Sequence, residues 1–128
     1  MYELVKKYIG IPYKLHGRTF EGLDCYGFPI LFEKELGHEM YDLYRDYTDN
    51  NEKDLDNNIH NIVYANKLKK TEIPIFGDIL LFYDRKGRVC HMGVYLKNND
   101  FIHCDCEGVR ISNLSKYKLK SEAYTWLN

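Results

Sequence analysis

The sequence lacks an excess of charge of either sign. Lys and Arg number 18 and Asp and Glu number 19 among 128 residues, which leaves a formal net charge of -1. Surfaces that bind nucleic acid are typically strongly basic, because they neutralise phosphates. The composition therefore argues against nucleic acid as a partner.

Long apolar runs are also missing. The opening residues, "MYELVKKYIG", contain no apolar stretch of signal-peptide length, and no later segment approaches the roughly 20 apolar residues that span a membrane. We therefore expect no membrane span, and synthesis in the cytoplasm. Without an export signal, the four cysteines are more typical of free thiols than of a disulfide framework. They are Cys25, Cys90, Cys104 and Cys106.

The first part of the chain contains two helical patterns. Residues 2–9 carry apolar side chains at helical spacing and are followed by Gly10, which predicts a short amphipathic helix. A second apolar stripe predicts a helix that begins at about Asp24 or a few residues later and ends before Gly37. Asp24 is a favourable N-cap residue. Pro29 disfavours a regular first turn, so the helix is expected to be distorted there or to begin late.

The middle region, residues 38–70, is polar and rich in Asn and Asp. We interpret it as a variable helical insertion within one domain of residues 1–128, because the chain length fits a single domain and no internal repeat is present. One amphipathic helix is predicted near residues 55–63, with Asp49 or Asn50 as its cap. Tyrosines at every third position are expected to pack in the core: Tyr41, Tyr44 and Tyr47.

The last region has the pattern of β-strands. The segments "GDILLFYD", "VCHMGVYL", "FIHCDC", "GVRIS" and "AYTWL" are each apolar or alternating and are separated by turn residues. Helices followed by consecutive antiparallel strands are typical of the α+β class. We therefore expect N-terminal helices packed on an antiparallel sheet.

Strand alternation places the two histidines of this region. His91 points to one face of its strand and His103 to one face of the next, and the neighbouring cysteines point to the opposite faces. The two histidines share a face only if opposed residue numbers in the hairpin sum to an even value, which requires a three- or five-residue loop or a bulge. In that register the backbones of His91 and His103 are diagonal neighbours, roughly 7–8 Å apart.

The other cysteines and histidines have simpler interpretations. The cysteines at 90, 104 and 106 are predicted to be small core residues, since cysteine is usually buried. A zinc site is disfavoured, because pleating separates these cysteines from the histidines. We expect no metal and no cofactor. The remaining histidines are predicted to lie at the surface: His16, His38 and His60.

Cys25 differs from the other cysteines because it precedes the apolar stripe of its helix. Free backbone N–H groups and the helix dipole stabilise a thiolate at such a position, so its pKa is expected to lie below about 8.5. Nucleophilic thiol catalysis needs a thiolate, a base and a group that orients the base. Cys25, His91 and His103 supply these three groups.

Five motifs resemble those of the NlpC-type cysteine peptidases, the papain-like endopeptidases of bacterial cell walls. In order, the family pattern is G-x-P-Y, D-C-x-G-F, G-D-hydrophobic-x-x-F, H-x-G-hydrophobic-Y and hydrophobic-H. All five occur within "YIGIPYKLHGRTFEGLDCYGF" and "GDILLFYDRKGRVCHMGVYLKNNDFIHCDCEGVRISNL". The resemblance implies a papain-like cysteine peptidase fold.

The resemblance also implies catalytic roles. Cys25 matches the nucleophile, His91 the general base and acid, and His103 the residue that orients the base. The backbone N–H of Cys25 is the expected oxyanion donor, because attack on a carbonyl places the developing charge at the helix N-terminus.

Three further residues match substrate-binding positions. Tyr13 matches a tyrosine that lines the site and assists substrate binding or oxyanion stabilisation. Asp24 matches an acidic residue beside the nucleophile, which we interpret as a cap first and a substrate contact second. Tyr26 stands where many members have a serine associated with binding the stem peptide. Tyr26 and Pro29 depart from the family pattern, which leaves the exact peptide specificity open.

The resemblance implies hydrolysis of the peptidoglycan stem peptide between D-glutamate and the diamino acid. A phage-encoded enzyme, tail-associated or lytic, fits this interpretation, with phage tail or cell-wall components as partners and delivery to the wall through a phage or lysis. Two alternatives stay open. One is another papain-like thiol amidase or acyltransferase, although circularly permuted acyltransferases place histidine before cysteine. The other is a non-catalytic phage tail assembly module with the same fold.

Overall fold

A computed structural model describes residues 2–40, 42 and 67–127. The helix predicted near residues 55–63 and the three tyrosines of the middle region lie outside these residues, as does His60. The extent of the insertion and the single-domain assignment stay predictions. Within the described residues, no helix has the length and apolar character needed to cross a membrane.

Two helices form where the sequence predicts them. Helix α1 spans Tyr2–Tyr8 and helix α2 spans Gly27–Glu35. The late start of α2 follows from Asp24, whose Oδ1 atom accepts hydrogen bonds from the backbone N–H groups of Tyr26 and Gly27. Asp24 therefore caps the helix from a position before its first turn.

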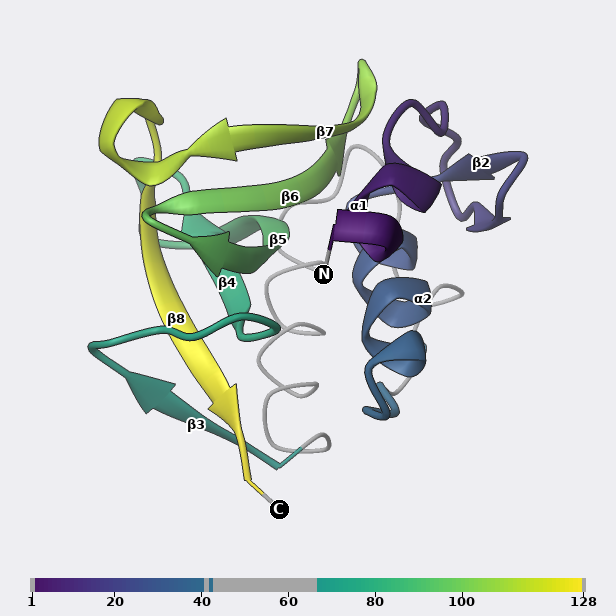
Figure 1. Ribbon diagram of the computed structural model, residues 1–128. Helices are drawn as coiled ribbons and strands as arrows, with labels where there is room; N and C mark the ends of the chain where they lie inside the picture. The colour runs from purple at the N-terminus through teal and green to yellow at the C-terminus, as the bar shows by residue number, and fades with distance from the viewer. Residues whose placement is uncertain (1, 41, 43–66, 128) are drawn as a thin grey trace.

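The strands form two antiparallel sheets among the described residues. A two-stranded hairpin precedes α2, and a six-stranded sheet has the order β3-β8-β4-β5-β6-β7 (Figure 1). The five strands predicted from the sequence are confirmed as β4 to β8. The bounds are β1 Arg18–Thr19, β2 Gly22–Leu23, β3 Leu68–Thr71, β4 Ile79–Tyr83, β5 Val89–Lys97, β6 Asp100–Asp105, β7 Gly108–Asn113 and β8 Lys120–Trp126.

Strand β8 does not follow β7 at the edge of the sheet, as consecutive strands would. It lies between β3 and β4, antiparallel to both, and crosses the sheet as the long yellow arrow of Figure 1. The cause lies in β4, whose segment Ile79–Phe82 is buried on both faces. A strand of this kind is typical of the interior of a sheet, so β4 needs a neighbour on each edge. Strands β5 and β8 supply these neighbours.

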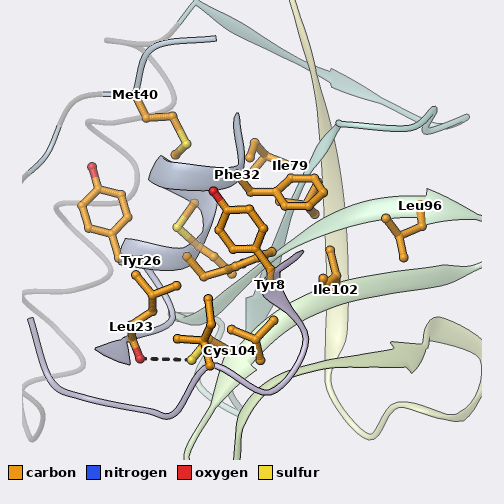
Figure 2. Close-up of a cluster of buried hydrophobic side chains, with 14 of the residues drawn as sticks. Tyr8, Leu23, Tyr26, Phe32, Met40, Ile79, Leu96, Ile102 and Cys104 are labelled. Atoms are coloured by element: carbon orange, nitrogen blue, oxygen red, sulfur yellow. Dashed lines mark hydrogen bonds between the residues drawn. The ribbon is translucent and has the colours of Figure 1, made fainter. Parts of the chain in front are cut away.

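Both helices lie on one side of the sheet (Figure 1). Their aromatic side chains form the main core, in which the rings of Tyr8 and Phe32 meet edge to face with centroids 5.3 Å apart (Figure 2). Ile79 and Ile102 face this core from the sheet. A smaller cluster covers the opposite face. It combines strand residues with residues of the segment after β7. The strand residues are Leu80, Phe82, Tyr95, Phe101 and Ala123, and the residues of the segment are Leu114, Tyr117 and Leu119.

Candidate active site

The register of the β5–β6 hairpin has the parity that the sequence required. Val94 is opposite Ile102 and Tyr95 is opposite Phe101, so opposed numbers sum to an even value. The register then shifts between Tyr95 and Lys97, which is the bulge that the prediction needed. His91 and His103 consequently lie on one face of the sheet.

Strands β5 and β6 separate beyond this paired region. Before Val94, β5 pairs with β4, whereas after Ile102, β6 pairs with β7. The segment that leads into α2 bridges the two strands here. The Cys104 thiol donates a hydrogen bond to the Leu23 carbonyl at 3.0 Å (Figure 2), and the Met92 backbone amide interacts with the Cys25 sulfur. This bridge places Cys25 against the strand that carries His91.

The two histidines form a hydrogen-bonded pair. The Nε2 atom of His91 lies 2.7 Å from the Nδ1 atom of His103. On its other side, Nε2 of His103 lies 2.8 Å from the Ser112 hydroxyl on β7. The contact between the histidines leaves the Nδ1 atom of His91 for a reacting group. Ser112 was not identified from the sequence, although the β6–β7 register would have placed it on the face of His103.

Aromatic rings surround this pair. Phe82 lies 5.6 Å from His91 between ring centroids, and Phe101 lies 4.6 Å from His103. Tyr117 meets the His103 ring edge to face at 5.6 Å. A Cβ atom at Gly93 would lie 3.0 Å from the Phe101 ring and 3.4 Å from the Cβ atom of His103. Glycine at this position therefore leaves the room in which the rings pack.

Both imidazoles are uncharged at neutral pH. Burial, reinforced by the charge of His103, lowers the pKa of His91 to about 3. Burial also lowers the pKa of His103 to about 4, against the opposing charge of Asp105. His91 is 8% exposed and His103 is 0% exposed. The neutral form is the one in which a histidine can accept a proton.

Cys25 has a pKa shift opposite to the one expected from its sequence position. Burial raises the pKa of its thiol, and the neighbouring Asp24 carboxylate raises it further, whereas the Met92 amide opposes the rise. The N–H groups of Tyr26 and Gly27, at the start of the helix, donate to the Asp24 carboxylate and not to the Cys25 sulfur. The resting site therefore holds a thiol and a neutral imidazole.

The three predicted substrate-binding residues occupy different environments. Tyr13 is half-buried and pairs with Leu23 in an isolated parallel bridge, near the nucleophile. Asp24 is buried, and beyond its capping role it accepts hydrogen bonds from the His16 backbone and from Arg18. Tyr26 is 1% exposed, with the Arg18 guanidinium over its ring at 5.3 Å. Asp24 and Tyr26 thus make contacts within the fold, and the substrate-binding roles of all three residues stay predictions.

The other cysteines and histidines depart in part from the predictions. All four cysteines are free, and Cys104 is buried as predicted, but Cys90 is half-buried and Cys106 is exposed. Cys106 lies in the turn beyond β6, where alternation no longer applies. The prediction that His38 lies at the surface is wrong. Its ring stacks on that of Trp126, with centroids 4.4 Å apart, and its Nδ1 atom contacts the Glu33 carboxyl. Within the described residues, no cluster of three or more His, Cys, Asp or Glu side chains suits a metal ion.

Comparisons with known sequences identify relatives of the chain. A profile described as the NlpC/P60 family matches residues 10–125. The probable peptidoglycan endopeptidase LytE of Bacillus subtilis (strain 168) is 33% identical over 110 residues. The match covers 86% of this chain, which spans 28% of the length of that relative.

Solved structures agree at the level of the fold. The NlpC/p60 domain of the peptidoglycan hydrolase SagA superposes with a TM-score of 0.62 at 22% identity, over 94% of this chain and 92% of that chain. A protein of Staphylococcus aureus subsp. aureus Mu50, described as similar to lipoprotein and of the NLP/P60 family, superposes with a TM-score of 0.70 at 19% identity. That match covers 99% of this chain and 40% of that chain.

Proposed function

Because the chain belongs to the NlpC/P60 family, we propose that it is a cysteine endopeptidase that hydrolyses the stem peptides of peptidoglycan. Its α+β fold is papain-like, as the sequence predicted. The observation that carries the proposal is the contact between His91 and His103. It lies beside Met92 of β5, whose backbone amide interacts with the Cys25 sulfur. LytE is described as a probable peptidoglycan endopeptidase and SagA as a peptidoglycan hydrolase, which supports the substrate class.

In the first step, the Cys25 thiol attacks the scissile carbonyl carbon. The Nδ1 atom of His91 takes the thiol proton as the new carbon–sulfur bond forms, because Nε2 of the same ring is held by His103. The low pKa of His91 keeps this base unprotonated before attack. Burial raises the pKa of the thiol, so the proton is expected to leave Cys25 during the attack.

The backbone N–H of Cys25 stabilises the developing oxyanion. The neighbouring N–H groups of Tyr26 and Gly27 are occupied by Asp24, and Phe28 donates to the Asp24 carbonyl. Among the described residues no acceptor takes the N–H of Cys25, so this donor at the start of α2 is available to a carbonyl oxygen.

In the later steps, His91 acts as an acid and then again as a base. Its proton passes to the leaving amine as the carbon–nitrogen bond breaks, which leaves an acyl group on Cys25 as a thioester. Water then attacks the thioester with His91 as base, and Cys25 regains its proton. His103 keeps the His91 ring oriented throughout.

We further propose that the protein meets its substrate at the cell wall. Phage- or lysis-dependent delivery, predicted from the sequence, is compatible with a domain of this fold. Partners in a phage tail or in the wall stay predictions. Activity toward isolated walls does not depend on the route of delivery, so the chemistry can be tested first.

Digestion of purified sacculi tests the proposed function. Sacculi with diaminopimelate and sacculi with lysine are incubated with the protein, and soluble products are identified by mass spectrometry. We expect stem-peptide fragments with a new amino terminus at the diamino acid. Cys25→Ala should release none, whereas the matched variant Cys106→Ala, which alters an exposed cysteine, should behave as the wild type.

Other products would favour the alternatives. Cleavage between muramic acid and the first alanine would identify an amidase, and transfer to an added amine would identify an acyltransferase. A wild-type protein that releases nothing from either type of sacculus would contradict the peptidase proposal and favour a non-catalytic module.

A further inference from the structure

Ser112 contacts the Nε2 atom of His103, whereas His91 contacts the Nδ1 atom of the same ring. We propose that Ser112 is a positioning residue that selects the tautomer of His103 and thereby keeps the Nδ1 atom of His91 free of its proton. The inference rests on the proposed function, since it assigns a role in the same reaction. It concerns a hydroxyl on β7 for which none of the sequence motifs predicted a role.

Strand register brings the three side chains into one line. Ser112 is opposite Phe101 in the β6–β7 ladder, and His103 is opposite Arg110. Ser112 and His103 are therefore diagonal neighbours on one face. His91 reaches the other nitrogen of His103 from β5, beyond Val94–Ile102, the last pair of the β5–β6 ladder. The contacts His91–His103 and His103–Ser112 thus connect three adjacent strands, β5, β6 and β7, whose backbones hold the three side chains in place.

The burial of His103 makes the Ser112 contact consequential. The ring is 0% exposed and packs against Phe101 and Tyr117. Buried ring nitrogens need partners, because an unsatisfied polar atom loses its hydration without compensation. His91 satisfies Nδ1, and the Ser112 hydroxyl is the partner of Nε2 among the described residues.

Two arrangements of protons satisfy this line of contacts. In the first, Nε2–H of His91 donates to Nδ1 of His103, and Nε2–H of His103 donates to the Ser112 oxygen. In the second, every donor and acceptor is reversed, and His91 carries its proton on Nδ1. Only the first arrangement leaves His91 a lone pair on Nδ1 with which to take a proton from Cys25.

The serine oxygen favours the first arrangement. Ser112 is half-buried, so its own proton can be directed to solvent while the oxygen accepts from Nε2–H of His103. Without that oxygen, the first arrangement leaves a buried N–H unpaired, whereas the second leaves only a lone pair unpaired. Orphaned buried N–H groups are the rarer of the two in proteins. Removal of the hydroxyl should therefore shift His103 toward the unproductive tautomer.

Side-chain NMR tests this directly. Long-range proton–nitrogen spectra of the histidine rings are recorded for the wild type, Ser112→Ala and Ser112→Thr, without substrate. We expect the wild-type His103 to carry its proton on Nε2, the alanine variant to move it wholly or partly to Nδ1, and threonine to restore the wild-type pattern. Ser121→Ala, on β8, serves as the matched control.

Kinetics on a soluble stem peptide give the second readout. Ser112→Ala should lower kcat by about three- to tenfold, the usual effect of one buried hydrogen bond, with KM unchanged because the proposed role of Ser112 acts through His103 and not on the substrate. Threonine should recover most of the loss, and thermal unfolding should show that both variants are folded.

Two results would overturn the role of Ser112. One is a wild-type tautomer in Ser112→Ala. The other is an equal loss of kcat in Ser112→Ala and Ser112→Thr, which would indicate packing alone. A wild-type protein without activity on sacculi would instead overturn the proposed function, while the ring spectra would still decide the tautomer.

Discussion

The Nε2 atom of His91 and the Nδ1 atom of His103 lie 2.7 Å apart, and the two rings meet edge to face with centroids 4.9 Å apart. The contact joins β5 to β6 beyond the last backbone pair of their hairpin. It occupies the Nε2 atom of His91 and leaves Nδ1 as the nitrogen proposed to take the proton of Cys25. The orientation of the proposed base therefore depends on a residue twelve positions further along the chain.

Replacement of His103 should lower turnover without removing it. His103→Ala deletes the hydrogen bond that orients His91, and loss of a bond that stabilises a developing charge corresponds to about a 10- to 100-fold fall in kcat. His103→Asn should retain more activity than alanine, because an amide oxygen can still accept from Nε2–H. Steady-state kinetics on a stem peptide provide the measurement. Wild-type turnover by His103→Ala would mean that Cys25 and His91 act as a dyad.

Activity should persist at mildly acidic pH. Burial lowers the pKa of His91 to about 3, so the base stays unprotonated below the ordinary histidine value of about 6.5. We expect kcat/KM to hold its value from pH 7 to pH 5. Because burial raises the pKa of Cys25, its alkylation by iodoacetamide should be slower at pH 7 than that of the exposed Cys106. An acid limb near pH 6.5 would argue for a solvated, readily charged His91.

Asp24→Asn should make Cys25 more reactive and the fold less stable. Removal of the carboxylate charge lowers the pKa of the neighbouring thiol, so alkylation at pH 7 should accelerate. The carboxylate of Asp24 accepts hydrogen bonds from backbone N–H groups, including those of His16 and Gly27. The NH2 group of an asparagine would point at one of these donors, which costs about 1–3 kcal/mol of unfolding free energy. Peptide mapping and urea denaturation measure the two effects. Slower alkylation in a folded variant would show that the carboxylate does not control the thiol.

Stability should fall as the pH rises, because of Glu33. This side chain is 0% exposed, and burial, with the charge of Asp78, raises its pKa to about 9 from 4.5. Between these values the folded protein holds a proton on Glu33 that the unfolded chain releases. The stability that this neutral carboxyl contributes is therefore full below about pH 4.5 and is lost as the pH rises toward 9. We expect the unfolding free energy to fall by ~4 kcal/mol from pH 5 to pH 8.

The matched variant Glu33→Gln isolates this contribution. An amide stays neutral at every pH, so its stability should vary much less over the same range. His38 contacts the Glu33 carboxyl, and Trp126 interacts with it as well, so urea denaturation at each pH should be read for both proteins together. Parallel curves for wild type and Glu33→Gln would assign the pH dependence to other groups.

Local patterns were sufficient to predict much of the fold. The apolar stripe that ends at Gly37 predicted α2, and the apolar segments from Ile79 onward predicted β4 to β7. The hairpin parity could be stated only as a condition, because a one-residue slip would send His103 to the opposite face, and the observed register meets that condition. The side-by-side placement of His91 and His103 thus followed from alternation and from one condition on the turn.

Features that depend on distant contacts could not be predicted. The insertion of β8 beside β4 depends on which strand covers an open edge, and no local pattern encodes that choice. Strands β1 and β2 have two residues each, too few for a periodic signal. The pKa of Cys25 depends on burial and on the use of the helix N-terminus by Asp24, and both arise only in the folded protein.

The place of β8 within the sheet has a consequence for the order of folding. In the part of the chain that the structure describes, β8 is the strand that joins β3 to β4, so the interior of the sheet is incomplete until residues 120–126 have left the ribosome. Contacts of this range in sequence slow folding, since the chain must close long loops before the contacts stabilise it. A nascent chain can therefore contain Cys25, His91 and His103 and still lack the completed sheet that supports them. The proposed peptidase activity therefore requires that β8 has been synthesised and has entered the sheet.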